Sequence, residues 1–273
     1  MKMLVIDKYN YPRDLAQMDM YSVLQEKYDI IYSNPNNLID FVKEDNYDYL
    51  YLGIYHPWCG ISNLEEILKI NKKPVIIDQA DNEGFIARKN SKIIYTENSI
   101  LLSRYLPNER LSNFWKGKLM LLPWYINPDR FLPQEKIIDL SFVCTINIKR
   151  LGADRKKMSL DIKQYCMDNS LKCAIGENYK EYSDIITKSK AMVIDGSRYC
   201  LTQKYIEAAL SNCLIIGEKP TSPENDLITI DLESFNYLKS YDDVILHNRN
   251  YVLNNFCNKD NFLKIFENII SSF

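Results

Sequence analysis

The sequence is short of the residues on which metal and thiol chemistry depend. It has two histidines, His56 and His247, and none of its seven cysteines forms a C-x-x-C pair. A zinc site of clustered histidine and cysteine is therefore not expected, and the odd number of cysteines argues against a disulfide framework. Most of the cysteines fall within apolar strand or helix patterns, so we interpret them as buried free thiols in a reducing compartment.

Long apolar runs and an excess of one charge are also absent. The opening run M-K-M-L-V-I-D is interrupted by Asp7 and Lys8, too early for a signal peptide or a membrane span. The formal net charge is -2 and the pI about 5.8, so no general attraction to nucleic acid or to an anionic bilayer is expected. These features predict a cytoplasmic protein that associates with membranes peripherally at most.

What the chain does contain is a series of short apolar runs. Hydrophobic residues make up 46% of its 273 positions, which is enough for two small α/β cores. Runs of strand length form two series, at 3–7, 30–32, 49–53, 75–78, 93–95 and 120–122, and at 140–143, 172–175, 191–194, 214–216 and 228–230. Because these strands are continuously apolar and alternate with helical patterns, they predict parallel sheets covered on both faces.

Three prolines, Pro123, Pro128 and Pro133, separate the two series. Proline fixes φ and cannot donate to a strand ladder, so we place a domain boundary there. We predict an α/β protein with two Rossmann-like, doubly wound parallel-sheet domains facing a cleft, at residues 1–133 and 134–250. A helical segment at 251–273 is expected to pack back on the first domain. In such sheets ligands bind beyond the carboxyl ends of the strands, so the residues that follow each strand are the candidates for a site.

The block from 171 to 220 carries most of the chemical information. It contains a strand that ends at Gly176, a second strand followed by D-G-S-R, and a helix with Lys204 and Glu207 on one face. Thr202 is a suitable N-cap for this helix, whose first-turn N–H groups favour an anion. An ammonium near phosphate and a carboxylate on ribose hydroxyls would suit a nucleotide-sugar. Taken alone, however, K-x-x-E is typical of a solvated surface pair, worth about 0.2–0.5 kcal/mol.

The residues just before this helix are also suited to phosphate. Gly196 allows close backbone approach, Ser197 supplies a hydroxyl and Arg198 supplies a fixed positive charge. We therefore include Ser197 and Arg198 among the candidate diphosphate ligands.

The order of these motifs resembles the C-terminal domain of the GT-B glycosyltransferases, especially the spore-maturation-type and other family-one-like transferases. The shared pattern is a glycine-ended strand, a tyrosine-led helix, S-K before an apolar strand, and then K-x-x-E-A. It matches Gly176, Tyr182, Ser189 with Lys190, Lys204, and Glu207 with Ala208. Asn212 stands where the family usually has glycine, and asparagine tolerates the same left-handed cap. Upstream, P-W-Y-I-N-P-D-R-F at 123–131 is similar to the interdomain segment of the family.

A basic loop leads into a helix that begins near residue 155. The family places an arginine here, which points to Arg155 as a pyrophosphate ligand, with Lys156 beside it. A planar guanidinium suits phosphate oxygens, and hydrogen bonds to charged groups contribute about 1.5–3 kcal/mol each. The alternative is a solvated basic helix start.

The first half of the chain offers three candidates for acceptor chemistry. His56 ends an apolar strand and is either a base or sugar ligand or a structural loop histidine. Asp78 and Asp81 follow the strand at 75–78, where each would serve as a base or as a helix cap. The resemblance favours Asp81, because similar sequences place an aspartate after this strand. The family's glycine-containing first loop is replaced here by K-Y-N-Y-P-R, so its acceptor contacts do not carry over.

The resemblance implies glycosyl transfer from a nucleoside-diphosphate sugar to a hydroxyl of a glycan, a lipid-linked or another acceptor. The sequence has no D-x-D motif, so neither a metal nor another cofactor is expected. Arg155, Lys204 and first-turn amides would stabilise the leaving group instead. Two alternatives stay open: a non-catalytic two-lobed binding protein for a small molecule, and a glycosyltransferase that acts on modified DNA bases. The acidic pI argues against the second, since nucleic acid is normally bound by a broad basic face.

Overall fold

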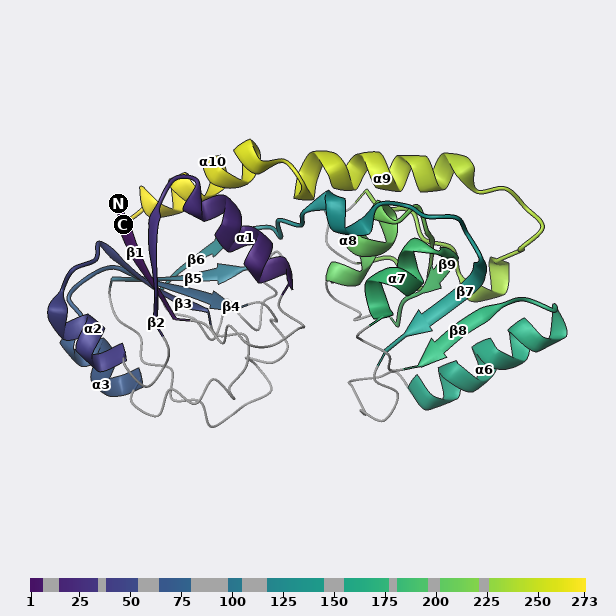
Figure 1. Cartoon of the computed structure of the whole chain (residues 1–273), viewed down its shortest axis with the longest axis horizontal. Helices are drawn as coiled ribbons and strands as arrows, with labels where there is room; N and C mark the ends of the chain where they lie inside the picture. The colour runs from purple at the N-terminus through teal and green to yellow at the C-terminus, as the bar shows by residue number, and fades with distance from the viewer. Residues whose placement is uncertain are drawn as a thin grey trace. The chain divides into compact units, whose positions relative to one another are not determined.

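The computed structural model describes residues 1–6, 15–33, 38–53, 64–79, 98–104, 117–144, 155–176, 181–195, 202–220 and 226–273. The chain divides into two compact units, which we call the first unit (1–125 with 259–273) and the second unit (126–258). Each unit contains one parallel sheet flanked by helices (Figure 1). The predicted α/β fold class, with two Rossmann-like parallel sheets, is confirmed.

The sheet of the first unit has six parallel strands in the order β2-β1-β3-β4-β5-β6. The strands are β1 (Lys2–Ile6), β2 (Asp29–Ser33), β3 (Tyr49–Gly53), β4 (Val75–Gln79), β5 (Ser99–Ser103) and β6 (Lys118–Leu121). β5 was not predicted from the sequence, and the strand predicted at 93–95 lies outside the described residues. Strands β3 and β5 are buried along nearly their whole length, as continuously apolar strands require.

Helices cover both faces of this sheet. Leu38 and Val42 of α2 (Leu38–Glu44) and Ile67 of α3 (Leu64–Ile70) pack in one core cluster with strand residues such as Leu50. On the other face, the rings of Tyr21 in α1 (Leu15–Gln25) and Phe266 in α10 (Lys259–Ile270) lie 5.7 and 6.4 Å from the ring of Tyr51. The C-terminal helix α10 is therefore part of the first unit, next to α1 (Figure 1).

The sheet of the second unit has four parallel strands in the order β10-β9-β7-β8. They are β7 (Ile138–Val143), β8 (Cys173–Gly176), β9 (Ser189–Val193) and β10 (Leu214–Ile216). The strand predicted at 228–230 is wrong, because that segment makes only an isolated bridge between Ile230 and Ile216. The side chain of Asn248 holds the segment by hydrogen bonds to both the N–H and the C=O of Ile228, each 2.8 Å.

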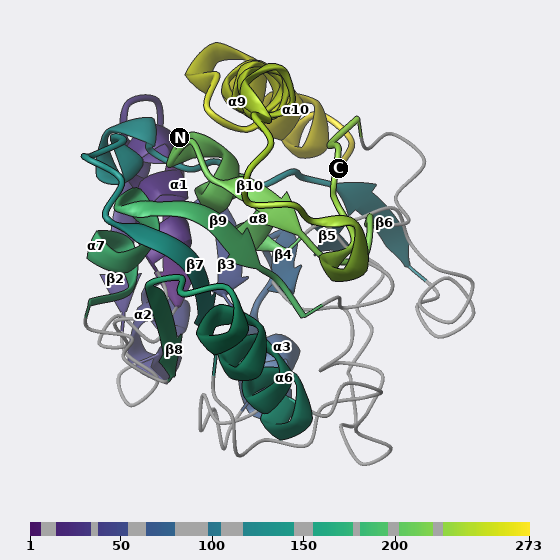
Figure 2. The same ribbon diagram turned by 90° about the vertical axis from the view of Figure 1, so that its right-hand side faces the viewer.

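The helices of the second unit are α6 (Arg155–Asp168), α7 (Tyr182–Thr187), α8 (Gln203–Leu210) and α9 (Asp242–Phe256), with 3-10 turns η1 (Pro128–Phe131) and η3 (Leu232–Ser234). Helix α6 lies beside β7 and β8 in both views (Figure 1, Figure 2). Its Ile162 and Cys166 join Leu140, Phe142 and Val193 in the core of this unit.

The burial of the cysteines agrees only in part with the prediction that they are buried thiols. Within the described part of the chain, Cys144, Cys166, Cys173, Cys213 and Cys257 are thiols outside any disulfide, and the first, second and fourth of these are buried. Cys173 is exposed at the start of the edge strand β8, which corrects the prediction for this residue. Burial raises the pKa of Cys213 to about 12 and keeps it a neutral thiol.

Helix α8 shows how the ends of a helix follow from its sequence. Asn212, just beyond the C-terminus, has φ +54°, so the predicted left-handed cap is confirmed. Arg249 Nη1 donates to Asn212 Oδ1 at 3.0 Å and fixes this end against α9. Thr202 occupies the N-cap position with extended backbone, but its hydroxyl makes no capping hydrogen bond, contrary to the usual role of a threonine there.

Gly217, which follows β10, gives a first prediction. Its φ is +137°, and a Cβ at this position would collide with the carbonyl oxygen of Ile194. We expect Gly217→Ala to lower the free energy of unfolding by more than the ~1–3 kcal/mol of backbone strain alone, because the clash is with a fixed backbone atom. Urea unfolding measures the loss. Gly176→Ala is the matched control, since Gly176 has a similar φ of +144° but open space around its Cβ position. Equal losses in the two variants would contradict the expected clash.

Candidate functional site

Both sheets reverse their strand order beside their first strand, between β1 and β3 in the first unit and between β7 and β9 in the second. In parallel α/β sheets this switch point, at the carboxyl ends of the strands, is where ligands bind. In the second unit the switch point brings together the ends of β7 and β9 with residues from the starts of helices α6 and α8. The candidate site is built from these four elements.

Asp195 lies at the centre of this site, two residues after β9. Its side chain is 8% exposed, and its Oδ2 accepts a hydrogen bond from Nε of Arg155, the first residue of α6. Its Oδ1 lies 3.9 Å from Nζ of Lys204, in the first turn of α8. The two predicted phosphate ligands are thus brought together by a carboxylate that was not among the predicted site residues.

Lys204 contacts the ends of both strands at the switch point, β7 through Val143 and β9 through Asp195. Its Nζ donates to the carbonyl oxygen of Val143, the last residue of β7, at 2.8 Å. Burial lowers the pKa of Lys204, and the negative charge of Asp195 acts in the opposite direction. The ammonium is therefore positioned at the carboxyl edge of the sheet, with 26% of its side chain exposed.

Glu207 lies one turn further along α8. Its Oε2 accepts a hydrogen bond of 2.7 Å from the hydroxyl of Tyr182, the first residue of α7. Tyr182 was part of the motif that carried the resemblance, but no role was predicted for it.

Asp195 could have been identified as a site residue from the sequence, because it lies directly after an apolar strand and before G-S-R.

Of the other predicted donor-binding residues, the structure describes Gly176, Lys156 and Thr202. Gly176 ends β8 with a positive φ that other residues rarely adopt. Lys156 is exposed on α6 beside Arg155. Thr202 directly precedes α8, and its buried Oγ1 has no hydrogen-bond partner within the described part of the chain. Ser197 and Arg198 lie outside the described residues.

In the first unit only one of the three predicted catalytic residues is described. His56 and Asp81 lie outside the described residues, whereas Asp78 lies in β4 and is 0% exposed. Its Oδ2 accepts hydrogen bonds from Tyr51 Oη and from Arg104 Nη2. A base must come within hydrogen-bonding reach of its substrate, so this buried ion pair favours a structural role for Asp78.

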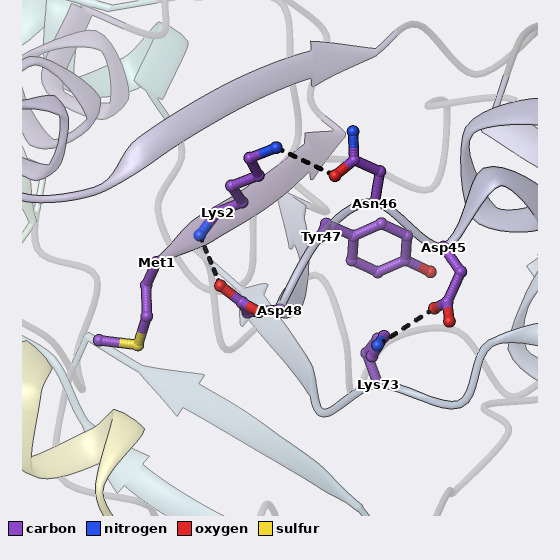
Figure 3. A pocket seen from close by; sticks show the side chains of 7 residues that line it. All are labelled: Met1, Lys2, Asp45, Asn46, Tyr47, Asp48 and Lys73. Carbon is purple, nitrogen blue, oxygen red and sulfur yellow. Dashed lines mark hydrogen bonds and ion pairs between the residues drawn. The ribbon is translucent and has the colours of Figure 1, made fainter.

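A separate hollow lies at the amino ends of the strands of the first unit. It has a volume of about 420 Å³ and is lined by Met1, Lys2, Asp45, Asn46, Tyr47, Asp48 and Lys73 (Figure 3). Its polar groups pair with one another: Lys2 Nζ donates to Asn46 Oδ1 at 3.0 Å, and Lys73 Nζ lies 3.3 Å from Asp45 Oδ1. This is the edge of the sheet opposite to the one where ligands are expected, so we assign it no ligand.

No group of three or more His, Cys, Asp or Glu side chains within the described ranges is placed to hold a metal ion. Of the helices in that same part of the chain, none has the length and apolar character needed to cross a membrane.

No protein-family model matches the chain, and no curated protein matches its sequence. Its structure is similar to sucrose-phosphate synthase from Thermosynechococcus elongatus, with a TM-score of 0.65 at 10% identity over 100% of both chains. Anabaena HepE in complex with UDP and glucose gives 0.59 at 8% over 100% of both chains. The lipopolysaccharide outer core galactosyltransferase WaaB gives 0.56 at 12%, over 100% of this chain and 99% of the other. The fold is therefore the GT-B fold of two Rossmann-like units.

Proposed function

We propose that this protein is a glycosyltransferase that takes its sugar from a nucleoside-diphosphate sugar. The observation that carries the proposal is the cluster of Arg155, Lys204 and Glu207 at the switch point of the second unit. Two cations beside the N-terminus of α8 suit a diphosphate, and a carboxylate one turn further along suits the ribose hydroxyls. Structures of HepE with UDP and with UDP-glucose support this choice of donor, because they share the fold.

The proposed reaction transfers a hexose or pentose to a hydroxyl of a glycan, a lipid-linked or another acceptor, as in the spore-maturation-type transferases. The bond between the anomeric carbon and the diphosphate oxygen breaks, and a bond from the acceptor oxygen to that carbon forms. Arg155, Lys204 and the first-turn amides of α8 stabilise the charge on the departing diphosphate without a metal. If the reaction inverts the anomeric configuration, Asp81 or His56 takes the proton of the acceptor hydroxyl; a retaining reaction does not require this base. We propose a cytoplasmic location for this reaction.

A thermal-shift screen of the wild-type protein with UDP-, GDP-, ADP- and dTDP-glucose tests the proposal. A ligand at one hundred times its Kd is expected to stabilise the protein by about 2.7 kcal/mol, because it binds the folded state only. The sugar nucleotide that gives the largest shift is then incubated with the protein, and the release of free sugar is followed over hours. A protein that none of the four stabilises would overturn the proposal. Stabilisation without hydrolysis would instead indicate a binding protein.

A further inference from the structure

Asp195 is an unexpected group in an anion site. It lies between the two cations that the proposed function assigns to the diphosphate, and its side chain is 8% exposed. A carboxylate at this place repels a phosphate and cancels the charge of one of the two cations. With Arg155 and Lys204, it leaves the group of three with a net charge of about +1.

The fold holds Asp195 in this position. The hydrogen bonding of β9 to β10 continues beyond the strand, because the N–H of Ile194 donates to Ile216 O at 2.9 Å. Gly217 then packs so closely on Ile194 that a Cβ would not fit. On the other side, Arg155 approaches from the start of α6 and Lys204 from the first turn of α8. The backbone before Asp195 is therefore fixed, so its carboxylate keeps its place beside Arg155 and Lys204.

We propose that Asp195 reduces the advantage that the free nucleoside diphosphate has over the nucleoside-diphosphate sugar in binding to this site, and that it thereby promotes product release. This inference rests on the proposed function. The diphosphate of the donor is esterified at both ends and carries a charge of about −2, whereas the free product carries about −3 above its last phosphate pKa of about 6. Asp195 repels the product by one charge more than it repels the donor. Without it, the two cations would favour the product over the donor more strongly than the wild-type site does.

Asp195→Asn separates this role from mere orientation of Arg155. Asparagine keeps the size of the side chain and its ability to accept a hydrogen bond, but removes the charge. We expect the ratio of Kd for UDP-glucose to Kd for UDP to rise about tenfold relative to wild type at about pH 8, since the extra negative charge of UDP is then no longer repelled by Asp195. At about pH 5.5 the terminal phosphate of UDP is mostly protonated, so the rise in this ratio should be clearly smaller than at pH 8.

Isothermal titration with UDP-glucose and UDP measures both constants, and the GDP, ADP and dTDP pairs are tested in the same way. The matched control is Asp184→Asn, which removes one negative charge from an exposed pair with Lys188 in α7. This control should leave the ratio unchanged at both pH values. Should Asp195→Asn fail to fold, Asp195→Ser removes the same charge and is measured instead. Between the two pH values the wild-type ratio should change less than the ratio of the Asp195→Asn variant.

The outcomes separate the two proposals. A wild-type protein that binds none of the four pairs would overturn the proposed function and this inference with it. A wild-type protein that binds a pair, combined with an unchanged ratio in the Asp195 variant, would leave the function in place and reject the charge role of Asp195. An equal change at both pH values would also reject it, because a loss of orientation does not follow the titration of the terminal phosphate.

Discussion

Replacing Arg104 by methionine is expected to lower the free energy of unfolding by about 3–5 kcal/mol. The side chains of Arg104 and Asp78 are both 0% exposed, and Arg104 Nη2 donates to Asp78 Oδ2. Methionine keeps much of the apolar stem but supplies no charge, so the variant leaves a carboxylate buried without a counterion. The loss of an uncompensated buried charge is far larger than that of an exposed ion pair.

The surroundings of Arg104 add to this effect. Its guanidinium lies 4.6 Å from the centre of the Trp124 ring and donates to the carbonyl oxygen of Leu122 at 3.1 Å. The arginine thus ties the segment that follows β6 to the carboxyl end of β5. Tyr51 donates to the same carboxylate oxygen from β3, so Asp78 joins β3 and β4 to the residue that directly follows β5.

Urea unfolding of single and double variants tests this account. The double variant Asp78→Leu with Arg104→Met should recover only part of the loss, because it removes the buried charge but also the acceptor of the Tyr51 hydroxyl and the donor to Leu122 O. Lys73→Met, which breaks the exposed pair with Asp45, is the control and should cost less than about 1 kcal/mol. A loss in Arg104→Met as small as that of the control would reject the structural role of the ion pair.

Much of the fold could be predicted because its signals are local. Continuous apolar runs between helical patterns predicted parallel sheets, and nine of the predicted runs lie within strands or overlap them. The strand β5 was not predicted, because its short apolar run I-L-L is flanked by serines, which are common in loops. Those serines, Ser99 and Ser103, are buried in the sheet, where their backbone pairs with β4 and β6.

The site could be predicted only where its signals were equally local. The spacing of Lys204 and Glu207 placed them on one face of a helix, but Asp195 is 40 residues from Arg155, and only the order of the strands brings them together. Asp78 shows the same limit, since its partner Arg104 is 26 residues away. An aspartate after an apolar strand has the same sequence pattern whether it serves chemistry or a buried ion pair.

Glu207→Ala is expected to abolish stabilisation by the nucleotide sugar while the fold stays intact. Hydrogen bonds to a charged group contribute about 1.5–3 kcal/mol each. Losing the hydrogen bonds from two ribose hydroxyls to Glu207 would therefore weaken binding of the donor at least about a hundredfold. At a donor concentration that gives wild type about 2.7 kcal/mol, such a variant would gain only about 0.4 kcal/mol. The fold is expected to tolerate the change, because Glu207 is only partly buried.

Thermal shifts of three variants, measured at the same donor concentration, decide the role of this carboxylate. Tyr182→Phe removes the 2.7 Å hydrogen bond to Glu207 but keeps the charge, so it should weaken binding only several-fold. Glu233→Ala removes an exposed carboxylate of the same unit and should shift as wild type does. If Glu207→Ala also shifts as wild type does, the nucleotide binds elsewhere, since no other observation would then connect α8 to the ribose. If Tyr182 of α7 positions Glu207 for the ribose, stabilisation by the donor should be unchanged in Glu233→Ala, reduced in Tyr182→Phe and smallest in Glu207→Ala.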